Sequence, residues 1–170
     1  MKRMAFRAAL VAVALAVGAG PTLAAEDFCK NADGSINQTA TRGYRQIEAN
    51  RNEKTMKRIN GIWFSQTRNP FTGQVSYLWE VYEGKGANAG LYSYWNTVCD
   101  SIGCSRWYQG TGLWAVQGGA KKFSGMRIVS DLSRDHFCQL IDGALSDSNA
   151  VWTTSAGGVY RRARQIGVIP

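Results

Sequence analysis

The chain has 170 residues, of which 45% are hydrophobic and 11% aromatic, and a formal net charge of +8. This length fits one domain of ordinary size. The sequence has no internal repeat, no low-complexity linker and no nucleic-acid-binding motif, and its basic residues are dispersed, so DNA or RNA is not an expected partner.

The first 25 residues show the three parts of a secretory signal peptide. Basic residues open the segment, residues 8–16 are apolar, and small residues precede a cleavage point after Ala24 or Ala25. The apolar run is too short to span a bilayer, which takes about 20 residues. We therefore expect an exported protein, periplasmic or extracellular, with no stable membrane insertion. The segment holds three of the 20 basic residues and none of the 12 acidic ones, so the rest of the chain is only mildly basic.

Residues 26–60 are expected to form a leader followed by one amphipathic helix. No proline occurs between Thr39 and Ile59, and apolar residues recur there at roughly helical spacing among charged and polar ones. Asn37 or Thr39 would cap the N-terminus of this helix, and Gly61 lies beyond its end. The helix precedes a β-domain that is expected over residues 61–170.

The stretch from Gly61 to Gly119 carries five of the six tryptophans and sets apolar and aromatic residues at alternating positions between glycine-rich breaks. This alternation is typical of β-strands, whose successive side chains point to opposite faces. The strands predicted here cover residues 62–66, 74–83, 91–99, 105–109 and 113–117. Short loops rather than helices follow each strand, which indicates antiparallel neighbours.

Beyond Gly119 the sequence predicts a strand over residues 123–130 and a closing hairpin formed by residues 150–154 and 159–165. Residues 133–146 fit a helical template better than an alternating one, so a short late helix is favoured there and a strand is the alternative. The expected fold is mainly β: an antiparallel meander of about eight strands that closes into a barrel, because closure removes unpaired strand edges.

The four cysteines are expected to form disulfides, since their number is even and the chain is expected to be exported. Cys99 and Cys104 flank a turn-like insert and are the preferred pair, which leaves Cys29 for Cys138. Four cysteines allow three connectivities, so this pairing is a preference. A zinc site built from cysteines and His136 is a weaker alternative because the spacing matches no standard zinc motif. No metal or cofactor is expected.

Gly61-Ile62-Trp63 at the start of the first strand, together with Arg161 and Arg162 in the last strand, resembles the pattern of the lipocalins and the wider calycin superfamily. The resemblance implies an eight-stranded barrel in which Trp63 packs against Arg161 or Arg162 and closes the barrel floor. The sequence differs from that family in its long leading helix and in the favoured late helix.

Aromatic residues are the best candidates for a binding site, because their rings suit both a core and a pocket for a flat, apolar or sugar ligand. The candidate ligand-binding residues are Tyr77, Trp79, Tyr92, Tyr94, Trp95, Trp107 and Trp114. Their positions place rings on both faces of the sheet. An aromatic outer face would need a cover, for which the leading helix is a candidate.

Catalytic residues are not predicted. The chain has one histidine, His136, and no nucleophile is marked out by its neighbours. Glu80 shares a strand face with Leu78 and Tyr82, although ordinary placement on the strand surface is favoured for it. A small hydrolase acting through Glu80 or His136 is a third hypothesis. The first is a non-enzymatic binding protein for a small apolar or aromatic ligand in the barrel. The second is an interaction protein, such as an inhibitor or an envelope or glycan-binding factor, that acts through loops including residues 99–104.

Overall fold

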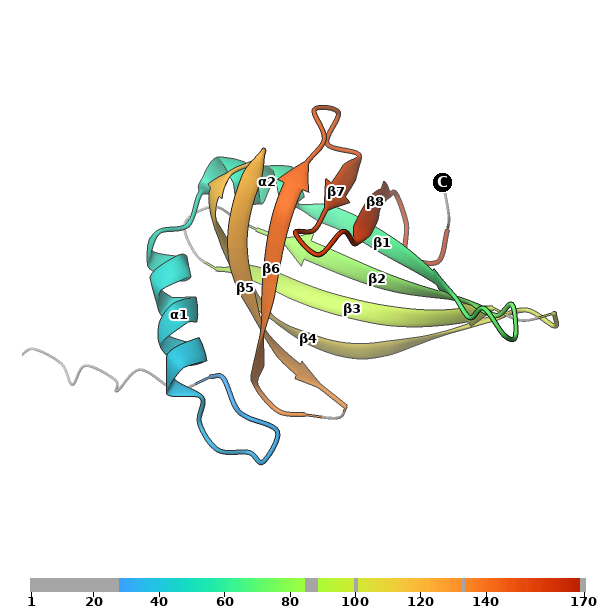
Figure 1. The fold of residues 1–170 in the computed structure, drawn as a ribbon, viewed down its shortest axis with the longest axis horizontal. Helices are drawn as coiled ribbons and strands as arrows, with labels where there is room; N and C mark the ends of the chain where they lie inside the picture. The colour runs from blue at the N-terminus through green and yellow to red at the C-terminus, as the bar shows by residue number, and fades with distance from the viewer. Residues whose placement is uncertain (1–27, 85–88, 100, 133, 169–170) are drawn as a thin grey trace, which may run out of the picture.

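The computed structural model describes residues 28–84, 89–99, 101–132 and 134–168, and the expected signal peptide lies outside them. Eight antiparallel strands pair in sequence order and close into a barrel, as Figure 1 shows. The strands are β1 Gly61–Arg68, β2 Val75–Glu83, β3 Gly90–Cys99, β4 Cys104–Gly119, β5 Lys122–Asp131, β6 Phe137–Leu145, β7 Val151–Thr153 and β8 Val159–Ala163. The predicted mainly-β barrel is confirmed.

The barrel interior is packed with aromatic rings that meet across it. Trp152 of β7 lies 5.9 Å from Trp63 of β1, 5.7 Å from Tyr82 of β2 and 5.5 Å from Phe123 of β5, between ring centroids. These strands are not neighbours of β7, so the contacts cross the interior. Trp63, Tyr82 and Trp152 are at most 1% exposed, as is Trp114 of β4. One end of the barrel is therefore a filled core.

Two helices precede the barrel where the sequence predicts one. Helix α1 spans Gln38–Ala49 and α2 spans Glu53–Ile59, with Asn50 at the C-cap of the first and Asn52 at the N-cap of the second. The prediction of a single helix is wrong because the two asparagines cap the backbone at a break. Asn37 is the N-cap of α1, and its side chain accepts a hydrogen bond from the backbone N–H of Ala40. Neither helix has the length and apolar character needed to cross a membrane.

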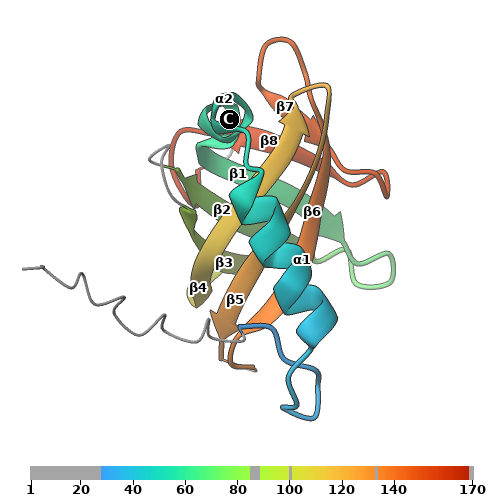
Figure 2. The ribbon, with the colours of Figure 1, turned by 90° about the vertical axis from the view of Figure 1, so that its left-hand side faces the viewer.

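Helix α1 covers the outer face of β4, β5 and β6 (Figure 2). Its Tyr44 and Ile47 pack with Ala115, Met126 and Ile128, which alternate with the inward-facing residues of β4 and β5. The helix therefore covers an aliphatic part of the outer surface and not the aromatic part that the sequence analysis assigned to it.

The favoured late helix is wrong, because residues 137–145 form strand β6. Phe137, Ile141 and Leu145 of this segment all belong to the barrel core. Their spacing of four residues fits one face of a helix and also one face of a strand, so it does not distinguish the two. Leu140, which the helical template also uses, is 76% exposed on the opposite face of the strand.

Strand β4 is one continuous strand, whereas the sequence suggested two strands broken at Gly110-Thr111-Gly112. A Cβ atom at Gly110 would lie 2.4 Å from the carbonyl oxygen of Ser130, and one at Gly112 would lie 1.7 Å from that of Ile128. These glycines therefore serve the close approach of β4 to β5 and do not form a turn.

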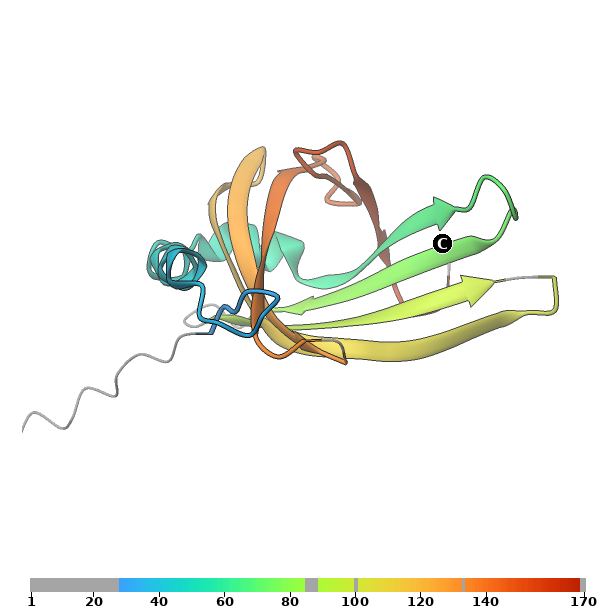
Figure 3. The same ribbon diagram turned by 60° about the horizontal axis from the view of Figure 1, so that its bottom comes forward.

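The hairpin of β7 and β8 is too short to seal the whole barrel wall. Strand β6 pairs with β7 only at Ala144 and Leu145, and β1 pairs with β8 only over residues 62–64. Figure 3 shows β1 and β2 running on far past this hairpin. Among the described residues, 65–68 of β1 and 137–143 of β6 therefore have no strand partner on this side, and this unpaired part of the wall is called the window.

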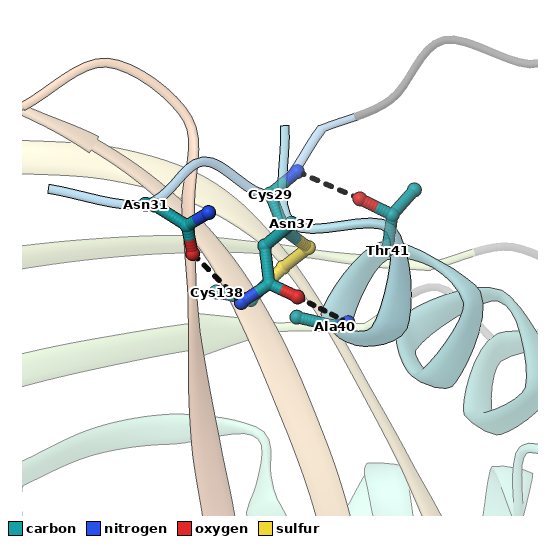
Figure 4. Close-up of a disulfide and its surroundings, with 6 residues drawn as sticks. All are labelled: Cys29, Asn31, Asn37, Ala40, Thr41 and Cys138. Atoms are coloured by element: carbon teal, nitrogen blue, oxygen red, sulfur yellow. Dashed lines mark hydrogen bonds between the residues drawn. A yellow bond between two sulfur atoms is a disulfide. The ribbon is translucent and has the colours of Figure 1, made fainter. Parts of the chain in front are cut away.

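Two disulfides join Cys29 to Cys138 and Cys99 to Cys104. The first ties the leader to β6 beside the start of α1 (Figure 4), where the backbone N–H of Cys29 also donates to the hydroxyl of Thr41. The second closes the turn between β3 and β4. All four thiols are used, which leaves no cysteine ligand for the zinc alternative.

Candidate functional site

A buried ion pair joins β2 and β5 across the barrel interior. Nη1 of Arg127, on β5, donates to Oε1 of Glu80, on β2, over 2.7 Å. The Glu80 side chain is 1% exposed and that of Arg127 is 12% exposed. Both residues alternate with outward-facing neighbours on their strands, which is how β2 and β5 aim them at each other.

Two tyrosine hydroxyls complete the hydrogen bonding of the Glu80 carboxylate. The hydroxyl of Tyr82 donates to Oε2 over 2.9 Å, and that of Tyr92 donates to Oε1 over 3.3 Å. Burial, with the nearby carboxylate, raises the pKa of both phenols well above the usual value, against the smaller opposing effect of Arg127. The phenols therefore stay protonated and remain donors at neutral pH.

The guanidinium of Arg127 is held on three sides and open on one. Its Nε donates to Oε1 of Gln139 over 2.8 Å, Nη1 also donates to the Tyr82 hydroxyl over 2.8 Å, and its Cζ lies 4.5 Å from the centroid of the Tyr92 ring. Burial, the largest single effect, lowers the pKa of Arg127, but Glu80 and the phenols of Tyr82 and Tyr92 together outweigh burial and raise the pKa overall, so the group stays charged. Among the described residues, Nη2 has no hydrogen-bond partner.

A cavity of about 550 Å³ reaches this cluster through the window beside β6. Glu80 and Arg127 line its inner end, and Trp152, Tyr160 and Ile141 line its walls. The β7–β8 turn, residues 154–156, lies at its rim. Burial, with a smaller contribution from Glu80, raises the pKa of Tyr160 to about 12, so this hydroxyl is also a neutral donor at the site. The cavity therefore combines an aromatic wall with a paired acid and base.

Comparison of the chain with protein-family models, with curated proteins and with solved structures finds no match. The chemistry of the site is therefore argued from its own residues.

The floor of the barrel is formed by Trp63 and Arg162. The guanidinium carbon of Arg162 lies 4.3 Å from the centroid of the Trp63 ring, and Arg162 also donates to the backbone carbonyls of Arg58, Asn60 and Asn149. The indole N–H of Trp63 donates to the carbonyl of Ile59 over 2.6 Å. Of the two arginines that the resemblance offered as partners of Trp63, the structure places Arg162 on the ring, while Arg161 faces outward.

The structure divides the seven candidate ligand-binding aromatics between the two faces of the sheet. Tyr92 and Trp114 belong to the interior core and Tyr94 packs against it, whereas Tyr77, Trp79 and Trp95 form an outer cluster. Tyr108 contacts Trp95 on the outer face of the sheet. Trp107 precedes Tyr108 on β4, so its side chain points to the inner face, where it is 42% exposed. None of the seven lines the cavity at the ion pair.

The outer aromatic cluster is covered by the end of the chain. Trp79 is 1% exposed and packs with Phe64, Ala163 and Ile166. The side chain of Arg106 fixes this segment by donating to the carbonyl of Ile166 over 2.9 Å. The C-terminal segment after β8 thus provides the cover that the sequence analysis expected from the leading helix.

Three residues of the site were missed from the sequence: Arg127, Trp152 and Tyr160. Glu80 stood out because it shares a strand face with Leu78 and Tyr82, but placement on the strand surface was favoured for it; that expectation is wrong, because the carboxylate is buried in the barrel interior. The signal for Arg127 was equally present, since it lies between Met126 and Ile128 in an apolar strand. His136 lies outside the cavity and contacts Asp135, with 2.7 Å between its Nδ1 and the Asp135 Oδ1. No cluster of three or more metal-ligating side chains occurs among the described residues.

Proposed function

We propose that this protein binds a small ligand in the barrel cavity, as a binding protein of calycin-like architecture. The observation that carries the proposal is the cavity of about 550 Å³ that reaches the buried Glu80–Arg127 pair. Small-molecule sites in proteins typically measure about 300–1,000 Å³ and combine apolar walls with a few convergent polar groups. The cavity has both features.

The lining argues for a flat, mainly apolar ligand with one neutral polar group. Trp152 and Tyr160 lie 5.1 Å apart with nearly parallel rings, so they offer an extended aromatic wall. Glu80 and Arg127 neutralise each other, so the inner end offers a donor and an acceptor without a net charge. A hydroxyl or carbonyl group on an aromatic or apolar body would match this arrangement.

The expected compartment and the barrel floor support the same proposal. Two disulfides are typical of exported proteins and rare in the cytosol. The stacking of Arg162 on Trp63 is the contact that the lipocalin resemblance implies. We propose that the protein acts outside the cytoplasm after removal of the signal peptide, and that its barrel is lipocalin-like in use as well as in topology.

The test is a titration with the neutral fluorescent probe N-phenyl-1-naphthylamine. Ala156 lies at the rim of the cavity on an exposed turn, so Ala156→Trp is expected to obstruct the cavity without disturbing the core. Ser148→Trp is the matched control, because Ser148 is exposed in the loop at the other end of the same hairpin. Saturable binding that Ala156→Trp abolishes and Ser148→Trp retains supports the proposal. Equal binding by both variants, or no binding by the parent protein, contradicts it.

A second candidate, an interaction protein acting through its loops, is favoured by two exposed hairpin tips. Phe71 in the β1–β2 turn and Ile102 in the β3–β4 turn are each 95% exposed. Residues of both turns line one hollow of about 470 Å³, so the tips lie side by side. The Cys99–Cys104 disulfide closes one tip, and Asn69 caps the other by accepting from the backbone N–H of Phe71.

This second function is tested by immobilising the protein, incubating it with a labelled envelope extract, and measuring which labelled protein it captures. Phe71→Ser and Ile102→Ser are expected to abolish capture if the tips form the contact. Leu132→Ser is the control, since Leu132 is 81% exposed in a different loop. Loss of capture in the control as well would indicate non-specific hydrophobic adsorption and would rule out this candidate function.

A further inference from the structure

A groove runs along the outer surface where β1 and β8 separate. Phe64 and Arg161 are the last cross-strand pair, and β1 continues through Gln66 to Arg68 without a partner on that side among the described residues. Val159 of β8 pairs only with β7. The separation leaves a hollow of about 800 Å³ on the outer face, distinct from the barrel cavity.

The groove carries arginines without partners. Arg68 and Arg161 both line it and both are exposed, and within the described chain neither side chain makes an ion pair or a hydrogen bond. Arg162 also lines the groove, but its donors are used on backbone carbonyls. None of the lining residues that the structure describes is acidic. The described part of the fold therefore holds two unpaired guanidinium groups around one hollow, and no carboxylate of that part lines it.

The floor between these arginines is apolar. Phe64 is 5% exposed and is the cross-strand neighbour of Arg161, and Val159 is 44% exposed although it lines the hollow. Val151, the partner of Arg161 on β7, lies on the other side. Gln66 adds an amide that can donate or accept a hydrogen bond.

We propose that this groove binds an oxyanion, of the phosphate class, that is attached to an apolar body. A guanidinium offers two parallel donors that match the oxygens of a phosphate, and two arginines can hold one such group from both sides. The apolar part of the ligand lies on Phe64, Val151 and Val159. The site is independent of the barrel cavity, whose paired Glu80 and Arg127 favour a neutral group.

The probe is octyl phosphate, titrated by calorimetry below the concentration at which it forms micelles, with octanol and inorganic phosphate as its separate halves. Binding is expected to be at least about tenfold tighter for octyl phosphate than for either half, because both contacts are needed. Arg161→Gln or Arg68→Gln is expected to weaken it about tenfold, the size of one lost charge-assisted hydrogen bond. Arg42→Gln is the matched control, since Arg42 is exposed on α1 and has no partner among the described residues.

The Ala156→Trp variant separates this site from the barrel cavity. Octyl phosphate should bind to it as it does to the parent protein, even if that variant loses N-phenyl-1-naphthylamine. Loss of octyl phosphate binding in Ala156→Trp, an equal effect of Arg42→Gln, or unchanged binding in Arg161→Gln and Arg68→Gln would overturn the proposal.

Vesicles distinguish the two sources of such a ligand. Co-sedimentation with phosphatidylcholine vesicles containing phosphatidic acid, lost in Arg161→Gln and absent with phosphatidylcholine alone, assigns the groove to a lipid headgroup. Binding of octyl phosphate without vesicle binding assigns it to a soluble ligand. Failure of both probes to bind would refute the anion site.

Discussion

Replacement of Arg127 by methionine is the sharpest test of the buried polar cluster. The substitution keeps much of the side-chain volume but removes the donors to Glu80, Tyr82 and Gln139. It also leaves the Glu80 carboxylate, 1% exposed, without its cation. Breaking a buried ion pair by removing one partner typically costs about 3–5 kcal/mol, and we expect a loss of that size in the free energy of unfolding.

The loss should be measured by urea denaturation at neutral pH, followed by tryptophan fluorescence, together with Glu80→Gln and the double variant. Domains of this kind are stable by about 5–15 kcal/mol, so the single variants should still fold. The double variant removes both charges. Its loss of unfolding free energy should be smaller than the sum of the two single losses by at least about 2 kcal/mol. Arg161→Met, an exposed arginine, is the control and should change stability by less than about 0.5 kcal/mol. A loss below about 1 kcal/mol in Arg127→Met would show that water replaces the guanidinium, and the buried-pair argument would fail.

Three further outcomes are expected. Replacing both Cys29 and Cys138 by serine should destabilise the protein by about 5 kcal/mol in the chain-entropy description, because the two residues are 109 apart in sequence; urea denaturation measures it. Arg162→Met should cost about 3 kcal/mol, because it leaves three partly buried carbonyls without this donor and removes the cation from the Trp63 ring, and thermal unfolding checks it. Raising the pH should unfold the barrel, because the pKa of Tyr160 is raised to about 12 and the folded state favours the protonated phenol. The stability that this phenol contributes is complete below a pH of about 10 and is lost as the pH rises toward 12. Absorbance at 295 nm measures tyrosine ionisation, and circular dichroism measures unfolding.

Each of these outcomes has a control. Removing the Cys99–Cys104 disulfide should cost only about 2 kcal/mol, because its loop is short, and an equal or larger cost would contradict the loop-length reasoning. Arg161→Met should leave thermal unfolding unchanged, and a loss equal to that of Arg162→Met would remove the special role of the floor contact. Ionisation of all tyrosines before any loss of circular dichroism would show that the interior phenols are hydrated.

The strand rhythm and the helix cap could be predicted because they depend on neighbouring residues. Alternation in residues 74–83 is enough to define β2, and Asn37 caps α1 through a hydrogen bond to a residue three positions away. Gly110 and Gly112 were misinterpreted because a glycine that forms a turn and a glycine that lets two strands approach look alike in a sequence. The deciding atoms, the carbonyls of Ile128 and Ser130, belong to another strand.

The candidate site was harder to predict because its contacts join distant positions. Glu80 and Arg127 are on strands separated by β3 and β4, so only barrel closure brings them together. The window depends on the shortness of β7, which has three residues, relative to β1 and β6. Strand lengths and the angle at which strands separate depend on the whole barrel. The pattern of residues 150–154 and 159–165 predicts a hairpin but indicates neither the shortness of β7 nor the separation of the strands.

Native mass spectrometry of the protein without residues 1–25, purified without organic solvent, tests the central claim that the barrel cavity holds a small ligand. We predict a bound small-molecule mass in the parent protein and in Ser148→Trp, and its absence in Ala156→Trp, whose substitution lies at the rim of the cavity. The same bound mass in all three proteins, or none in any of them together with no probe binding, would contradict the claim.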